Sequence, residues 1–429
     1  MAWSHATESG RRYTSGVGRR FGSRAISACA CILLLACRAA PGPPAQAIVV
    51  LVSIDGFRWD YLDRFDPPAL RALAAEGVRS DGLIPQFPSK TFPNHYTLVT
   101  GLRPATHGII SNNMAAPDIP GRFSLGHRDV LADPRWWGGE PIWNTAERQG
   151  RLTSPMFWPG SEAPIGGRRP TYWTAYEADM SNDVRVSKIL EWLALPEGKR
   201  PAFLTLYFSD VDSAGHSRGP DSADVRDAVA RVDESLGRLV SGVRAAGMAD
   251  RVHYVVVSDH GMAQVQADRM IVLDDLIDTR TVDVIDWSPV LALAPQDGNV
   301  DALYETLRGR HPSLAVYKSA DLPAKYGLAG HPRLPSVIGI ADEGWHITST
   351  HDMNRWKAGD GHAPGGNHGY DPELRSMHAL FIAAGPRFQR GTRVDPFENI
   401  HVYELMCALL GIEPASNDGD PSVTRPMLR

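Results

Sequence analysis

Three aspartates stand just beyond three short apolar runs, and this placement suggests that carboxylates meet at one place in the fold. Each run is rich in valine, isoleucine, leucine and aromatic residues, which is typical of a strand buried on both faces of a parallel α/β sheet. Such sheets bind ligands at the carboxyl ends of their strands, so carboxylates far apart in sequence can converge there. The three are Asp55 after residues 48–54, Asp212 shortly after residues 202–208, and Asp259 shortly after residues 252–257.

Three histidines accompany these carboxylates. His216 lies four residues after Asp212, and His260 directly follows Asp259. His368 lies in a glycine-rich loop. Taken singly, an aspartate at a strand end can cap a helix and a lone histidine is usually a polar surface residue. Taken together, three carboxylates and three imidazoles are enough for two metal ions with three protein ligands each. Mixed nitrogen and oxygen ligation suits zinc, which keeps a position open for substrate in catalytic sites.

A site with an open metal position needs a nucleophile, and Thr91 in the loop of residues 88–94 is the candidate. Threonine is a weak nucleophile at neutral pH, but metal coordination activates it. A position near a helix start would add backbone N–H groups that favour a phosphate, although Thr91 could equally be a simple helix cap. The sequence contains no G-x-x-x-x-G-K-[ST] loop and no H-E-x-x-H motif.

The surrounding pattern predicts the elements that hold these residues. Helices are expected over four segments and a further strand over residues 376–384, while residues 115–180, rich in Gly, Pro and Trp, are expected to form irregular surface with binding loops. A β-α-β-β pattern between the Asp259 and His368 regions predicts an inserted cap subdomain at about residues 283–347. The helices are expected at residues 67–76, 182–195, 222–246 and 398–410.

Six motifs in a fixed order resemble the nucleotide pyrophosphatase/phosphodiesterase family of the alkaline phosphatase superfamily. The resemblance runs from about residue 48 to about residue 412, and the C/S-x-P-x-R motif of the related sulfatases is not present. It implies an α/β, alkaline-phosphatase-like three-layer sandwich with a mostly parallel central sheet and a small inserted α+β cap. The motifs are V-S-I-D-G-F-R, K-T-F-P-N-H-Y-T-L-V-T-G, H-G-I-I-S-N, D-S-A-G-H, S-D-H-G-M and G-N-H-G-Y.

The resemblance also implies a role for each matching residue. Two Zn²⁺ ions are expected, with Thr91 bridging toward the first as the nucleophile and Asn112 donating a hydrogen bond to a phosphoryl oxygen. The reaction would pass through a threonyl-phosphoryl intermediate. The first zinc would be held by Asp55, Asp259 and His260, and the second by Asp212, His216 and His368.

Two aromatic residues bear on the substrate. In family members that cleave nucleotides, residues matching Phe92 and Tyr207 sandwich a base, although both could instead be core aromatics. Additional apolar walls could come from Trp136, Trp137, Trp158, Trp173 and Tyr176, or these could stabilise the irregular region. The expected activity is hydrolysis of nucleotide phosphodiester or pyrophosphate bonds to release nucleoside monophosphates. The alternatives are a choline-type phospholipid-headgroup phosphodiesterase and a catalytically silent metal-binding envelope protein.

The first 47 residues read as a leader. An arginine-rich segment precedes a short apolar stretch at residues 25–36, which fits a secretory signal, with a retained anchor helix as the alternative. Cleavage at the A-x-A site of residues 45–47 and a lipobox that lipidates Cys37 are both open. Removing the leader leaves Cys407 as the one cysteine, so no internal disulfide can form. These features predict an exported protein, periplasmic or lipid-anchored in a bacterial envelope, whose mature part is a catalytic domain at residues 48–429.

Composition limits the kinds of partner that the protein can bind. The 429 residues are 43% hydrophobic and carry a formal net charge of −5, so a large core is possible. No long basic run occurs, and binding of a nucleic-acid polymer is not expected. A small phosphodiester, such as a nucleotide, is the expected partner.

Overall fold

The computed structural model describes residues 46–429, so residues 1–45 of the predicted leader, with Cys37, lie outside the described residues. A seven-stranded sheet organises the protein, in the order β18-β2-β17-β8-β1-β7-β6. Its centre is parallel, because β1 pairs with both β7 and β8 in parallel, whereas β17 is antiparallel to β8 and β2. The strands are β1 (Ile48–Ile54), β2 (Val78–Ser80), β6 (Thr153–Ser154), β7 (Phe203–Phe208), β8 (Val252–Val257), β17 (Phe381–Ala384) and β18 (Thr392–Val394).

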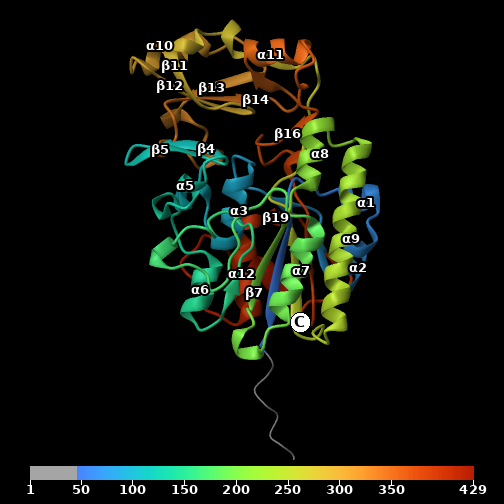
Figure 1. Ribbon diagram of the computed structural model, residues 1–429. Coiled ribbons are helices and arrows are strands. Elements are labelled where there is room, and N and C mark those ends of the chain that lie inside the picture. The colour runs from blue at the N-terminus through green and yellow to red at the C-terminus, as the bar shows by residue number, and fades with distance from the viewer. Residues whose placement is uncertain (1–45) are drawn as a thin grey trace, which may run out of the picture. The chain divides into compact units, whose positions relative to one another are not determined.

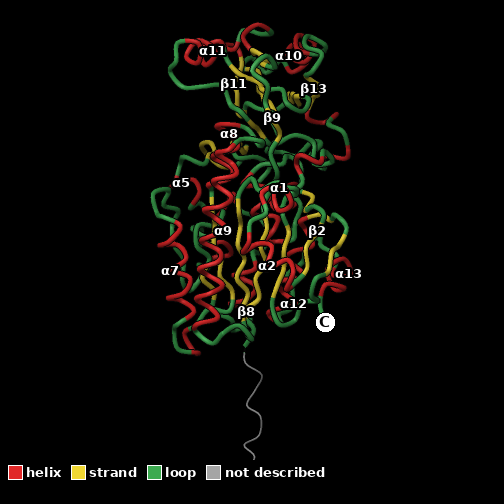
Figure 2. Tube along the Cα trace, turned by 90° about the vertical axis from the view of Figure 1, so that its right-hand side faces the viewer, coloured by secondary structure: helices red, strands yellow, loops and turns green. Residues whose placement is uncertain are grey.

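Helices cover both faces of this sheet, which gives three layers (Figure 1). Alternate residues of β1 enter different cores: Val49 and Leu51 pack on one side, Val50 and Val52 on the other. Because both faces are covered, β1 is apolar at nearly every position instead of alternating. The two sides are seen again in Figure 2. One face carries α1 (Tyr61–Phe65), α2 (Pro68–Glu76), α7 (Asn182–Leu193) and α9 (Ala223–Ala245), and the other α3 (Thr91–Thr100), α6 (Ile142–Arg148) and α12 (Val402–Leu410).

Three local expectations need correction. The strand expected at residues 376–384 begins only at Phe381, because the carbonyls of Ser376 and Met377 instead accept hydrogen bonds from the Met262 and Gly261 N–H groups. The helix expected from residue 398 begins at Val402 after a short 3₁₀ turn, and α13 (Pro421–Thr424) follows it. Residues 115–180 are not surface alone, since Trp136, Trp137, Trp143 and Trp158 enter the core. This region contains the β4–β5 hairpin (Asn113–Ala116, Ile119–Ser124), α5 (Arg128–Leu131) and α6.

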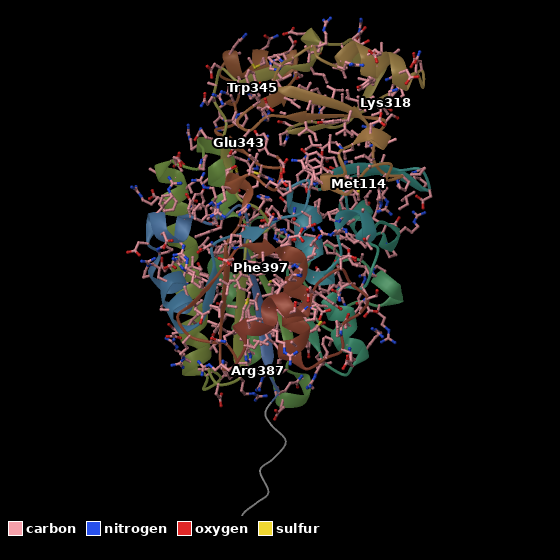
Figure 3. All side chains as sticks on the ribbon, turned by 180° about the vertical axis from the view of Figure 1, so that it is seen from behind. Met114, Lys318, Glu343, Trp345, Arg387 and Phe397 are labelled. Atoms are coloured by element: carbon pink, nitrogen blue, oxygen red, sulfur yellow. The ribbon has the colours of Figure 1, made fainter. Side chains whose placement is uncertain are left out.

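A separate four-stranded antiparallel sheet, in the order β11-β12-β14-β13, occupies the region of the predicted cap. It has its own apolar cluster, and Lys318 and Trp345 mark this region in Figure 3, far from Arg387 near the amino-terminal end of β1. The division of residues 48–429 into a catalytic domain and a cap at residues 283–347 remains a proposal. The elements are β11 (Val282–Asp286), β12 (Val290–Pro295), α10 (Val300–Leu307), β13 (Leu314–Lys318) and β14 (Val337–Ala341), followed by α11 (Thr350–Lys357).

Small elements complete the chain. Between residues 46 and 429, no helix is both long and apolar enough to cross a membrane. The helix that follows β7 is α8 (Asp210–Arg218), which carries two of the predicted site residues. The others are α4 (Pro104–His107), β3 (Leu83–Ile84), β9 (Ala263–Gln264), β10 (Met270–Val272), β15 (His346–Thr348), β16 (Gly366–Asn367) and β19 (Phe397–Glu398).

Candidate metal centre and substrate pocket

The first cluster of potential ligands joins the ends of β1 and β8. Asp55, Asp259 and His260 are all buried and offer ligand atoms within 4.8 Å of one another. His260 Nε2 lies 2.9 Å from Asp259 Oδ2 and 3.5 Å from Asp55 Oδ1. Thr91 Oγ1 lies 3.3 Å from the same His260 Nε2. The structure therefore brings the predicted nucleophile beside the predicted first half-site.

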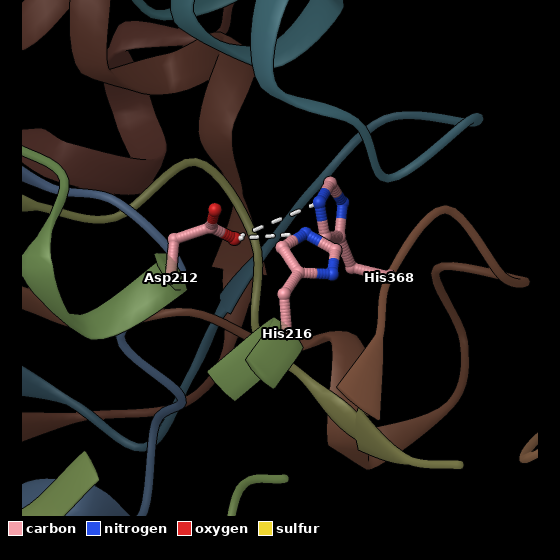
Figure 4. Close-up of side chains that lie close together, drawn as sticks. All are labelled: Asp212, His216 and His368. Atoms are coloured by element: carbon pink, nitrogen blue, oxygen red, sulfur yellow. Dashed lines mark ion pairs between the residues drawn. The ribbon is translucent and has the colours of Figure 1, made fainter. Parts of the chain in front are cut away.

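The second cluster consists of Asp212, His216 and His368. Asp212 and His216 are one turn apart on α8, and His368 follows β16 (Figure 4). Asp212 Oδ1 lies 3.4 Å from His216 Nε2 and 3.6 Å from His368 Nε2. A divalent cation at the point where these atoms converge would have three protein ligands and could keep a further position open.

The two clusters are neighbours. The rings of His260 and His368, one from each cluster, stack with centroids 3.5 Å apart and planes 12° apart. Gly56 permits this closeness: its φ is +67°, and a Cβ there would lie 2.9 Å from the Cα of Asp212. Glycine is required both for this left-handed conformation and for the close approach of α8 to the end of β1. The predicted grouping into two half-sites thus has a direct geometric counterpart.

All three histidines present the same ring nitrogen to the clusters. Each Nδ1 lies within hydrogen-bond distance of a backbone carbonyl: Gly366 O for His216 (3.1 Å), Gly261 O for His260 (2.9 Å) and Ser89 O for His368 (2.8 Å). A carbonyl can only accept, so Nδ1 carries the proton and donates. Each Nε2 then keeps its lone pair for a metal, which is the usual orientation of metal-binding histidine.

The carboxylates fit cations as well. Within residues 46–429, three buried carboxylate oxygens have no hydrogen-bond donor: Asp55 Oδ1, Asp212 Oδ1 and Asp259 Oδ2. The 2.9 Å contact of His260 Nε2 with Asp259 Oδ2 becomes an ion pair only when His260 is protonated at both ring nitrogens, and a metal ion bound at Nε2 would take the place of that second proton. A buried oxygen without a partner is costly. Cations between these atoms would satisfy the oxygens and the imidazoles together.

The pKa shifts reflect the burial of several carboxylates and imidazoles close together. Burial, followed by repulsion from Asp259 and Asp212, raises the pKa of Asp55 well above its ordinary value. Burial alone would also raise the pKa of Asp259, but His260 and His95 hold it well below. Burial, with His260 and His216, lowers the pKa of His368 well below its usual range, so that this imidazole is neutral.

Thr91 is the first residue of α3, and the helix cap is Lys90 rather than Thr91. Neither residue makes a side-chain capping bond within the described chain, so the Thr91 hydroxyl is not engaged as a cap. The Phe92 N–H donates to Asn112 Oδ1 at 2.8 Å, which fixes the Asn112 amide against the helix start. The Asn112 NH₂ group is the half left to donate to a substrate oxygen.

Tyr207 makes a contact with Asp55 that the sequence did not predict. Its hydroxyl donates to Asp55 Oδ2 at 2.6 Å, and burial followed by Asp55 raises the pKa of Tyr207 well above its ordinary value. It therefore orients a predicted metal ligand in addition to lining the pocket. Asp210, to which the sequence assigns no function, accepts instead from Asn182 Nδ2 at 3.1 Å.

An aromatic pocket of about 280 Å³ opens beside Thr91, Asp55 and Asp212. The predicted Phe92 and Tyr207 both line it, as do Trp137, Trp158 and Tyr176. Trp136 instead lies in the core, and Trp173 does not contribute to the lining. Phe157, which the sequence gave no reason to select, completes the apolar wall. The pocket places flat apolar surface next to the candidate nucleophile.

His95 is a further residue that sequence reasoning missed. It is fully buried, its Nδ1 donates to Thr91 O at 2.9 Å, and the same atom lies 3.3 Å from Asp259 Oδ2. His95 thus ties the first turn of α3 to a predicted ligand. One available signal was its position four residues after Thr91, which places it on the same helix face. Another was Ser53, a polar residue within β1 that contacts His95 Nε2 at 2.8 Å.

The comparisons with known proteins agree with this geometry. A family model described as type I phosphodiesterase / nucleotide pyrophosphatase matches residues 49–371. The chain belongs to this family. It is 38% identical over 377 residues to ectonucleotide pyrophosphatase/phosphodiesterase family member 5 of Homo sapiens, covering 88% of this chain and 77% of that protein. The predicted family resemblance is confirmed.

Some relatives are much longer than this chain. The chain is 37% identical over 389 residues to venom phosphodiesterase CdcPDE of Crotalus durissus collilineatus, but it spans only 45% of that protein. Its structure is similar to that of murine ectonucleotide pyrophosphatase/phosphodiesterase 5, an inactive threonine-to-alanine variant in complex with AMP. The TM-score is 0.84 at 35% identity, covering 90% of this chain and 100% of that chain. This likeness confirms the predicted α/β fold with its mostly parallel central sheet.

Proposed function

We propose that this protein is a two-zinc phosphodiesterase and pyrophosphatase that releases nucleoside monophosphates from nucleotide esters or anhydrides. One observation carries the proposal: two adjacent sets of carboxylate oxygens and imidazole Nε2 atoms converge, the Thr91 hydroxyl lies beside the first set, and an aromatic pocket is lined by Thr91 together with Asp212. Family membership supports the reaction class. The AMP complex of the murine relative supports a nucleotide as substrate.

In this mechanism, Thr91 Oγ attacks phosphorus while the bond to the leaving oxygen breaks. Water then hydrolyses the threonyl ester, which releases the nucleoside monophosphate and restores Thr91. Zinc ions, held by Asp55, Asp259 and His260 and by the Asp212 cluster, would supply Lewis-acid stabilisation of charge. Asn112 would donate its NH₂ group to a non-bridging oxygen, and its fixed amide is preorganised for this. The inactive threonine-to-alanine variant of the murine relative supports the nucleophile.

Removing one wall of the aromatic pocket tests the nucleotide assignment. We expect Phe92→Ala to lower kcat/KM for a nitrophenyl nucleotide ester by about five- to 150-fold, because base stacking contributes roughly 1–3 kcal/mol. Bis-nitrophenyl phosphate, which has no base, is the control substrate and should be affected much less. Equal losses on both substrates would contradict base stacking. Faster turnover of a glycerophosphocholine ester than of the nucleotide ester would instead favour the headgroup phosphodiesterase.

Metal removal and pH give a second test. We expect a chelator to abolish turnover and zinc to restore it. Zinc binding requires ionised Asp55, whose pKa burial and neighbouring carboxylates raise in the metal-free protein. Zinc affinity, measured by competition with a chromophoric chelator, should therefore fall with decreasing pH, beginning above the pH at which an ordinary carboxyl titrates. A protein that binds zinc tightly but turns over no ester would favour a silent metal-binding role.

Export is proposed from the leader pattern, with release to the periplasm or lipid anchoring through Cys37 as the two routes. Cys407, the cysteine of the predicted mature chain, is buried, so the folded region needs no disulfide. The mass of the mature amino terminus separates the routes, because lipidation leaves an acylated Cys37. An unprocessed chain recovered from the cytoplasm would overturn the proposed export.

A further inference from the structure

A buried ion pair outside both metal clusters stands directly beside the candidate nucleophile. Lys90 Nζ lies 2.6 Å from Asp286 Oδ2, and the two side chains are only 5% and 8% exposed. Lys90 caps α3 immediately before Thr91, whereas Asp286 ends β11 of the four-stranded sheet. Burying two charges is expensive, and removing one partner of such a pair is strongly unfavourable. The pair therefore fixes the start of α3 relative to the four-stranded sheet.

The same carboxylate holds the segment that carries Asn112. Asp286 Oδ2 accepts from the Ser111 hydroxyl, and Asp286 Oδ1 accepts from Asn113 Nδ2 at 3.2 Å. Ser111 and Asn113 flank Asn112, so one carboxylate contacts the neighbours of both the nucleophile and the predicted phosphoryl donor. Residues 88–91 and 111–113 come from different parts of the chain, and Asp286 is a shared anchor for them.

The other end of the same turn contacts the His368 segment. Ser288 Oγ accepts from Asn367 Nδ2 at 3.0 Å, and Asn367 Oδ1 accepts from the His368 N–H at 2.9 Å. Gly369, with φ +109°, leaves no room for a side chain, because a Cβ would lie 2.8 Å from Pro289 Cδ and 3.1 Å from Lys90 Cε. The turn thus packs tightly onto both sides of the site.

We propose that residues 286–289, here called the positioning turn, set the placement of Thr91, Asn112 and His368 relative to one another. The inference rests on the proposed phosphodiesterase function for its kinetic test. Asp286 and Ser288 are positioning residues, since they act through the neighbours of the reacting groups. The four-stranded sheet is then part of the catalytic apparatus rather than only a cover over it.

Asp286→Asn tests whether the positioning turn places Thr91 and Asn112. We expect kcat to fall by about ten- to a hundredfold with KM changed less than about twofold, because small misplacements of reacting groups cost rate. Zinc content should be unchanged. Asp283→Asn is the matched control: it lies on the same strand, and its ion pair with Arg122 (3.5 Å) on the β4–β5 hairpin is exposed. The control should retain the kcat of the unchanged protein.

A double variant distinguishes a positioning role of the Lys90–Asp286 pair from a role in stability alone. Lys90→Met with Asp286→Leu replaces the buried pair by apolar side chains, which should restore the melting temperature that Asp286→Asn lowers. We expect kcat to stay low in this double variant. Recovery of kcat together with stability would overturn the proposal, as would an Asp286→Asn protein with the kcat of the Asp283→Asn control.

The placement of His368 by the positioning turn can be tested through zinc affinity, which does not depend on turnover. Ser288→Ala should weaken zinc binding by roughly tenfold in competition with a chelator, since groups that orient a ligand affect metal affinity. Zinc held as tightly as in the unchanged protein would overturn the proposal that the positioning turn places His368. If the unchanged, zinc-loaded protein hydrolyses no ester, the proposed function fails while this competition still decides the inference.

Discussion

Thr91→Ala is expected to lower kcat for a nitrophenyl nucleotide ester by about 10⁴-fold or more while leaving the fold and the zinc content intact. The reason is geometric: the Thr91 hydroxyl lies 3.3 Å from His260 Nε2 and makes no helix-capping bond within the described chain. Its loss removes the attacking atom and, of the hydrogen bonds within the described chain, only the contact with His260. Steady-state hydrolysis, together with the melting temperature and zinc content of the same preparation, checks this result.

Thr91→Ser is the matched control, because it keeps the hydroxyl and removes only the methyl group. It should turn over at a rate far closer to that of the unchanged protein than to that of Thr91→Ala. Near-normal hydrolysis by Thr91→Ala would contradict the assignment of the nucleophile. An equal loss in both variants would point to a packing role for the methyl group.

Asp259→Asn is expected to lower both turnover and zinc content. We expect turnover to fall by about 10²-fold or more and the zinc content to fall from two ions per chain toward one, because an amide cannot replace an anionic ligand between His260 and Asp55. The metal-free variant is relieved of the repulsion that raises the pKa of Asp55, but it loses the carboxylate whose pKa His260 and His95 hold low, so we expect it to be no more heat-stable than the metal-free parent. Its stabilisation by added zinc should be smaller.

Asp210→Asn serves as the control for this experiment. Asp210 lies on α8 two residues before the candidate ligand Asp212, but its carboxylate accepts from Asn182 and belongs to neither cluster. Activity and zinc content should both be retained. If Asp259→Asn binds two zinc ions and turns over normally, the first half-site is wrongly assigned.

The sequence predicted the strands well, and the candidate ligands that it selected lie in two clusters, because both depend on short-range patterns. Apolar runs buried on both faces give β1, β7 and β8 directly, and an aspartate after each run reaches the same sheet edge. The residues that orient the site were harder to find. Asp286 and Ser288 lie on a turn with no motif, and their partners are about 80 to 200 residues away. Only tertiary contacts reveal them.

Other corrections have the same origin. The expected strand over residues 376–384 is shortened because its first carbonyls bond to the segment after β8, a pairing that local propensity does not contain. The Gly- and Trp-rich residues 115–180 look irregular in sequence, yet Trp136 and Trp158 are buried. Large aromatics in a loop-rich region therefore indicated a core there as much as a binding surface.

The stereochemical course at phosphorus tests the central claim most directly. A nitrophenyl ester of a nucleoside phosphorothioate with one configuration at phosphorus is hydrolysed in ¹⁸O-labelled water, and the configuration of the product is determined. Attack by Thr91 followed by attack of water is two in-line displacements, so the account predicts retention of configuration. Inversion would show a single displacement by water and would contradict the threonyl intermediate.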